Sequence, residues 1–142
     1  MARYFLWEHS LDYDHGTGHG VGVFSNVHQG PQGISRLNTI PLNPGMILSV
    51  EPGVYLEGKL GIRLENLVYV KMKSGYSGQK KEFLEFETLT LVPFEKKLIE
   101  KKLLSRDELH WLNSYHHNVC KKLSPFLNVS EKTWLRDACK IL

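Results

Sequence analysis

Glycine alternates with other residues near the start of this chain, in the run His-Gly-Thr-Gly-His-Gly-Val-Gly over residues 15–22. Each glycine costs a helix about 1 kcal/mol relative to alanine, so this run excludes a helix. His15 and His19 are therefore not a pair on one helical face, although four positions separate them. Glycine also lets a backbone approach a ligand closely. The run predicts a non-helical segment that presents two histidines at a functional site.

Two glutamates lie among apolar residues further along the chain. Glu51 follows the apolar stretch 47–50, and Glu65 lies within the largely apolar stretch 62–68. A buried carboxylate is costly unless it is paired or bound to a metal. Adjacent hairpin strands would place these two carboxylates side by side, where they repel each other unless a cation lies between them. The alternative is an ion pair with an arginine, for which Arg63 is the obvious candidate.

The combined donors favour a hard metal ion. His19, Glu51 and Glu65 offer one imidazole and two carboxylates, which suit manganese, iron or zinc better than copper. His28 follows His15 and His19 closely, which favours a functional role over a structural one for these histidines. A two-metal hydrolytic site holds ions about 3.5–4 Å apart and needs about four or five ligating side chains. The ligands found in this chain are fewer than such a site requires.

Turn residues separate a series of short segments with strand character between residues 12 and 92. Strands are expected over 21–24, 46–50, 54–56, 61–63, 67–72 and 83–92. Residues 42–45 predict a turn before the second of these strands, and 57–59 predict a hairpin turn. A loop is expected over 74–78, and residues 2–11 resemble the last turns of a helix.

Helical spacing replaces strand spacing after Pro93. Ser105 and Glu108 predict a capping box at the start of a helix that continues to Leu123. A shorter helix is expected to open at residues 130–133. Strands followed by helices predict an α+β fold with an antiparallel sheet and C-terminal helices.

The 142 residues, of which 42% are hydrophobic, are typical of one soluble globular domain. No apolar run approaches the ~20 residues that span a bilayer. The N-terminus lacks the pattern of a signal peptide, so a cytoplasmic protein with no membrane partner is expected.

Residues 71–142 carry fourteen Lys and Arg against nine Asp and Glu. Because acidic neighbours interrupt most lysine doublets, a solvated surface is expected rather than a nucleic-acid interface. Cys120 and Cys139 are expected to be reduced and structural.

Several motifs together resemble one enzyme family over nearly the whole chain. They are residues 15–22, Asn26-Val27-His28, Gly30-Pro31, Pro44-Gly45-Met46, Glu51-Pro52-Gly53, the segment 61–66 with sequence Gly-Ile-Arg-Leu-Glu-Asn, and Leu89-Thr90-Leu91-Val92-Pro93. They are similar to the C-terminal catalytic half of aminopeptidase P, the Xaa-Pro aminopeptidase of peptidase family M24. This family shares the pita-bread fold with prolidase, creatinase and methionine aminopeptidase. Residues 111–116 and 134–135 resemble the C-terminal extension of the longer, eukaryotic-like enzymes. The resemblance implies the second half of a pita-bread domain over 1–94 and a helical extension over 95–142.

The resemblance also implies roles for the residues already singled out. His19, Glu51 and Glu65 match three of five ligands of a dinuclear centre, usually manganese, with zinc or cobalt possible. Glu65 matches the bridging carboxylate, and Glu51 matches the ligand that also accepts a proton from water. His15 and His28 match the histidines that stabilise the scissile carbonyl of a peptide with proline at its second position. Arg63 matches a position that contacts the ligands from behind.

The departures from the family pattern concern the other two ligands. These are aspartates about ten residues apart and upstream of the histidines, whereas Asp12 and Asp14 have the wrong spacing. Gln29 also stands where an acidic residue is expected. We therefore expect a fragment of the enzyme, inactive alone, whose missing half could be encoded separately. Its uncovered apolar face favours self-association, and relatives of this type dimerise through their C-terminal regions, so a homodimer is expected.

Two other functions remain open at this point. Pita-bread domains without working metal sites bind peptides, histones or RNA elsewhere, so a non-catalytic binding module is the first alternative. Persistence of all five site residues argues against it, while the missing aspartates argue for it. A gene remnant without function is the second alternative.

Overall fold

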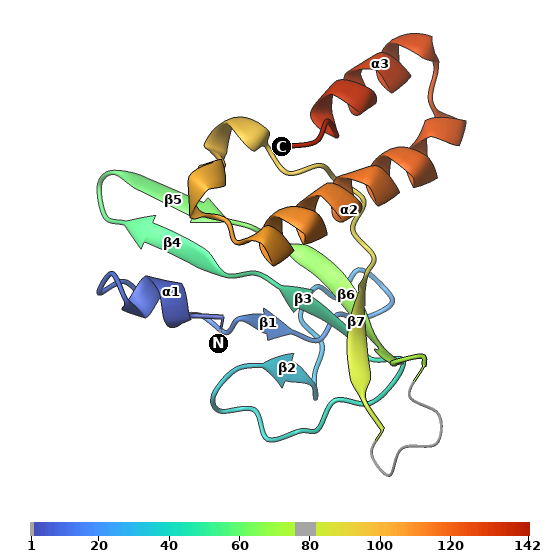
Figure 1. The fold of residues 1–142 in the computed structure, drawn as a ribbon. Helices are drawn as coiled ribbons and strands as arrows, with labels where there is room; N and C mark the ends of the chain where they lie inside the picture. The colour runs from blue at the N-terminus through green and yellow to red at the C-terminus, as the bar shows by residue number, and fades with distance from the viewer. Residues whose placement is uncertain (1, 76–81) are drawn as a thin grey trace. The chain divides into compact units, whose positions relative to one another are not determined.

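A computed structural model describes residues 2–75 and 82–142 of the chain (Figure 1). The chain divides into two compact units, Met1–Thr90 and Leu91–Leu142. The functional boundary after residue 94 stays a prediction. The first unit contains α1 (Tyr4–Trp7), β1 (Gly18–His19), β2 (Gly33–Ile34), β3 (Ile47–Val50), β4 (Gly53–Leu56), β5 (Leu60–Arg63), β6 (Asn66–Met72) and β7 (Leu84–Thr88). The second unit contains α2 (Arg106–Leu123), α3 (Val129–Ala138) and short 3-10 turns at Lys96–Leu98, Lys101–Leu103 and Ser124–Phe126.

The antiparallel sheets and C-terminal helices confirm the predicted α+β class. In the first unit β6 is the central strand of a three-stranded sheet, with β3 on one side and β7 on the other. Leu48 on β3 and Val68 and Val70 on β6 form the core of this unit, because alternate residues of neighbouring strands point to the same face. Figure 1 shows β3, β6 and β7 side by side, with β4 and β5 as a separate hairpin.

The strand pairs β3–β6 and β4–β5 share one register. Val50 of β3 lies opposite Asn66 of β6, and Gly53 of β4 lies opposite Arg63 of β5. The chain between the ladders keeps the same spacing on both sides, since the Leu64 N–H donates to the Pro52 carbonyl. Glu51 and Glu65 therefore fall opposite each other, as expected from a hairpin.

Strand β1 joins β2 to the central sheet. Gly18 and His19 pair with β2, and Gly20 forms a bridge with Leu48 of β3. The Glu51 N–H also donates to the Thr17 carbonyl at 2.8 Å. These contacts place the first histidine segment beside the strand that leads to Glu51.

The strand predicted over 21–24 is wrong. The Gly22 N–H donates to the Asn26 carbonyl, and Ser25 has φ +56°, so the chain turns back on itself there. Val23 and Phe24 are 85% and 93% exposed, so these two apolar side chains are not part of the core.

The remaining predictions are mostly confirmed, with shorter elements. The turn at Pro44-Gly45, the hairpin turn after β4 and the capping box at Ser105 are present. The helix near the N-terminus is one turn, and the last strand ends at Thr88 rather than at residue 92. The loop predicted over 74–78 lies partly outside the described residues.

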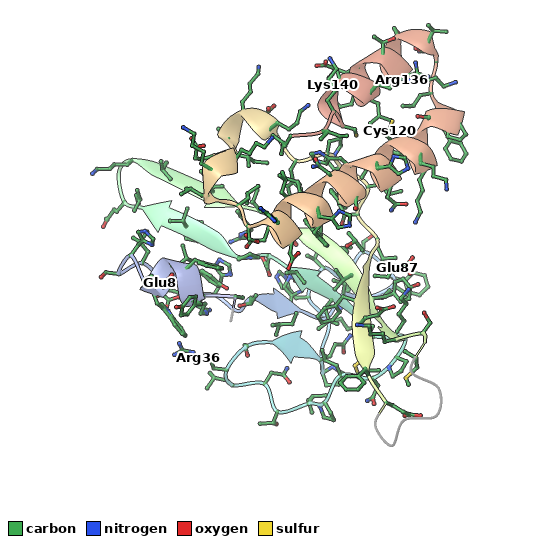
Figure 2. All side chains as sticks on the ribbon, in the orientation of Figure 1. Glu8, Arg36, Glu87, Cys120, Arg136 and Lys140 are labelled. Atoms are coloured by element: carbon green, nitrogen blue, oxygen red, sulfur yellow. The ribbon has the colours of Figure 1, made fainter. Side chains whose placement is uncertain are left out.

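The second unit has its own small core. Tyr115 and Val119 of α2 pack with Leu135 of α3. Cys120 and Cys139 are free thiols that pack against this cluster, and Figure 2 shows Cys120 on α2. Burial raises the pKa of the Cys139 thiol, which suits a structural thiol. No helix in the described parts of the chain is long and apolar enough for a membrane crossing.

Candidate metal centre

The His19 side chain is held by its own backbone neighbour. Its Nδ1 lies 3.0 Å from the Gly20 carbonyl oxygen. A carbonyl only accepts hydrogen bonds, so Nδ1 carries the proton and Nε2 is left to bind another group. Nε2 lies 3.1 Å from Glu51 Oε1. The bond to the Gly20 carbonyl thus orients the ring so that Nε2 faces the glutamate.

Two glycines allow this close arrangement of strands. A methyl group on Gly18 would stand 2.0 Å from the carbonyl oxygen of Ser49, and one on Gly20 would stand 2.0 Å from that of Gln29. These glycines therefore let backbone approach backbone. The expectation that glycine lets the backbone approach a ligand stays a prediction.

His19, Glu51 and Glu65 converge as the sequence predicts. One ligand atom from each side chain lies within 4.8 Å of the others. Metal bonds of about 2.0–2.2 Å place ligand atoms no more than about 4.4 Å apart, so a small movement of one side chain would bring all three atoms within bonding distance of one ion. The Glu65 side chain is free to make this movement, because it is exposed. Within residues 2–75 and 82–142 these side chains form the one such group, and they fit one ion rather than two.

The burial expected for both glutamates holds for one of them. Glu51 is 8% exposed, whereas Glu65 is exposed together with the neighbouring Leu64. Glu51 follows β3 of the central sheet, whereas Glu65 follows β5, whose four residues are all exposed. The cost of desolvation therefore calls for a cationic partner at Glu51 alone.

Glu51 has partners on both of its oxygens. Oε2 lies 3.3 Å from Arg63 Nη1, so the ion pair named as the alternative is present. On the other side, Oε1 lies 3.1 Å from His19 Nε2, a contact that is favourable only when a proton or a cation lies between the two atoms. That contact requires a shared proton or a shared cation, so the arginine does not satisfy the whole carboxylate.

His15 belongs to a second chain of hydrogen bonds. Arg63 Nε donates to the Tyr55 hydroxyl at 2.9 Å, and His15 Nε2 lies 2.9 Å from the same hydroxyl. His15 Nδ1 faces the Gly16 carbonyl at 2.7 Å and must carry the proton. Tyr55 therefore donates to His15 while it accepts from Arg63. This bond from Arg63 to Tyr55 is the main cause that raises the pKa of Arg63.

His28 lies on the other side of His19. The two rings are 4.1 Å apart between centroids, and His28 is exposed. A cavity of about 390 Å³ opens beside His19, and its lining includes His19, Val27 and Glu65. All six residues singled out from the sequence thus belong to one connected region of the first unit, and Tyr55 and Arg63 link His15 to Glu51.

Ser49 and Tyr55 were missed by reading the sequence. Both lie on the same face of the extended chain as Glu51, two residues before it and four residues after it. Since the hairpin register puts Arg63 and Glu65 opposite this face, strand alternation alone could have identified them.

The sequence matches two descriptions of known protein families. Residues 1–72 match metallopeptidase family M24, and residues 82–142 match the C-terminal region of peptidase M24. The chain belongs to peptidase family M24. Among curated relatives, the probable Xaa-Pro aminopeptidase P of Botryotinia fuckeliana is 48% identical over 95% of this chain, and that of Arthroderma gypseum is 50% identical over 96%. The chain spans only 22% of the length of each of these M24 peptidases.

The fold of this M24 chain also matches a solved structure. The crystal structure of the X-prolyl aminopeptidase of Caenorhabditis elegans superposes with a TM-score of 0.91 at 41% identity, over 99% of this chain and 23% of that one. That protein is described as a cytosolic enzyme with a di-nuclear active site. The match confirms the predicted resemblance and the second half of a pita-bread fold.

Proposed function

We propose that this chain forms the metal-binding wall of an Xaa-Pro aminopeptidase active site, with His19, Glu51 and Glu65 as ligands. The carrying observation is the convergence of their three ligand atoms within 4.8 Å. The 3.1 Å contact between His19 Nε2 and Glu51 Oε1 supports it, because a cation between these two atoms suits both of them. Manganese is the proposed metal, with zinc or cobalt as alternatives for the same oxygen and nitrogen donors.

A bound divalent ion supplies activated water and a polarised carbonyl. Glu51 is the proposed proton acceptor, and Arg63 holds its second oxygen. His15 and His28 are proposed to bind the scissile carbonyl. In the present arrangement His15 Nε2 accepts from Tyr55. A substrate carbonyl must therefore displace that hydroxyl and meet a protonated Nε2.

The substrate is proposed to be a peptide with proline at its second position, as the names of the relatives suggest. Because the chain spans about a fifth of those relatives, we propose that these 142 residues bind one ion and are inactive by themselves. Activity then requires a further segment that supplies the remaining ligands, which could be encoded separately. A cytosolic location and a homodimer belong to the same proposal.

Titration calorimetry with Mn²⁺ tests the proposed ligands. We expect one ion per chain, and at least tenfold weaker binding after His19→Ala or Glu65→Gln. His110→Ala is the matched control, since His110 is exposed on α2 in the other unit. Unchanged binding in the His19 and Glu65 variants would sink the proposed centre, and clear hydrolysis of an Xaa-Pro peptide by the 142-residue chain would refute its inactivity. Failure to bind Mn²⁺ combined with capture of histone tails or RNA would favour the non-catalytic module instead.

A further inference from the structure

Ser49 is a fully buried polar side chain between two of the proposed ligands. It lies on β3 with 0% exposure. Its Oγ accepts the backbone N–H of His19 at 3.0 Å and lies 3.3 Å from Glu51 Oε1. Because Oγ accepts from His19, its own proton is free to donate to the carboxylate. One hydroxyl thus joins the backbone of the first ligand to the side chain of the second.

The backbone pairing around His19 shows which bond the Ser49 hydroxyl replaces. The Glu51 N–H donates to the Thr17 carbonyl, and Gly20 pairs with Leu48. This register sets His19 opposite Ser49, where an antiparallel ladder would send the His19 N–H to the Ser49 carbonyl. The hydroxyl takes that N–H instead. The ordinary backbone bond is replaced by one that also reaches Glu51.

We propose that Ser49 is a positioning residue that couples the His19 backbone to the Glu51 carboxylate and so sets the affinity of the metal centre. The metal part of this inference rests on the proposed function. Groups behind metal ligands that orient them typically change metal affinity by about 10- to 100-fold when they are removed. The hydroxyl holds Glu51 Oε1 toward His19 Nε2, while Arg63 holds the other oxygen.

A purely structural role is the competing explanation. In that case Ser49 only satisfies a buried N–H, and its loss lowers stability without moving the ligands. Four proteins separate the two: the wild type, Ser49→Ala, Ser49→Thr and Ser49→Val. Threonine keeps the hydroxyl, and valine has nearly the same shape without it. Any crowding by the added methyl group is therefore common to Thr and Val, and their difference reports the hydroxyl.

The experiment combines Mn²⁺ calorimetry with nitrogen NMR of the His19 ring in the metal-free chain. We expect 10- to 100-fold weaker Mn²⁺ binding for Ser49→Ala and Ser49→Val, and Ser49→Thr within about threefold of wild type. The Nε2 signal of His19 should shift in Ala and Val but not in Thr, because Glu51 leaves Nε2 when the hydroxyl is absent.

Equal affinities and unmoved ring signals in all four proteins would overturn the positioning role, as would a threonine variant as weak as valine. If Ser49→Val does not fold, the comparison of Ala with wild type decides. If the wild type binds no Mn²⁺, the proposed function fails, and the ring signals of the metal-free proteins still decide whether Ser49 positions the two side chains.

Discussion

Gly18 sets how closely β1 approaches β3. A methyl group there would stand 2.0 Å from the Ser49 carbonyl oxygen, and backbone cannot yield as the end of a flexible side chain can. We predict that Gly18→Ala lowers the free energy of unfolding by about 1–3 kcal/mol. Gly16→Ala is the control, since its methyl group would meet no atom closer than 3.6 Å, and a change below about 1 kcal/mol is expected. Urea denaturation measures both, and equal losses would contradict the packing argument.

The glycine run also shows which properties of single residues could be predicted from the sequence. Its composition excluded a helix and drew attention to His15 and His19, which lie at the site. The reason for glycine at position 18 could not be predicted, because the atoms that exclude a side chain there belong to a strand about thirty residues away. Local sequence reports that a residue must be small, but the contact that demands it exists only after folding.

At the scale of elements, α3 begins earlier than its sequence predicted, and its N-cap is a different residue. The sequence placed the helix opening at Ser130, but Asn128 is the N-cap, and its side chain accepts from the Glu131 N–H. We predict that Asn128→Ala destabilises the chain by about 1 kcal/mol. Ser130→Ala should cost clearly less, since the Ser130 hydroxyl only donates to the Asn128 side chain. Thermal unfolding followed by helical circular dichroism compares the two, and a larger loss at Ser130 would contradict this assignment.

We predict that His116 makes the stability of the second unit sensitive to acid. The residue is fully buried, with Nε2 accepting the Phe94 N–H, and burial followed by the charge of Lys96 lowers its pKa. The unfolded chain therefore binds a proton near pH 6.5 that the folded chain does not. Stability is fully present above that pH and falls as the pH decreases through it, by at most about 1.4 kcal/mol per pH unit.

Denaturation of the wild type between pH 5 and 8 measures this slope. His116→Gln should flatten the slope, because glutamine can accept the same N–H and does not titrate. His117→Gln is the matched control, since His117 is the next residue of α2 and is exposed. A slope that survives in His116→Gln would assign the acid sensitivity to another group.

The hairpins were more predictable than the other strands for a physical reason. A turn at residues 57–59 between two short strands fixes its register locally, and that register places Glu51 opposite Glu65. Residues 21–24 are as apolar as the strands of that hairpin. A strand also needs a neighbouring strand to pair with, and the local sequence does not show which segment that is. Strand alternation places Tyr55 and Ser49 on the face of Glu51, but their residue types suggested no role, because those roles come from hydrogen bonds across the site.

At the scale of the whole molecule, the proposed ligands and the long helices belong to different compact units. His19, Glu51 and Glu65 lie in Met1–Thr90, and α2 and α3 lie in Leu91–Leu142. A ligand that binds only the folded state stabilises it by RT ln(1 + [L]/Kd), about 2.7 kcal/mol when the ligand stands at 100 times its Kd. Mn²⁺ bound at the proposed site would act directly on the unit that holds the proposed ligands, so we predict that its effect is confined to that unit.

Amide hydrogen exchange measures this effect in each unit of the intact chain. At 100 times its Kd, Mn²⁺ should slow exchange at Leu48 and Val70 by about 100-fold and leave Val119 in α2 unchanged. Glu65→Gln provides the control, because it removes a proposed ligand that is exposed and should lose the slowing without loss of the sheet. Equal slowing at Val119 would mean that the two units unfold together, and slowing that persists in Glu65→Gln would place the ion elsewhere.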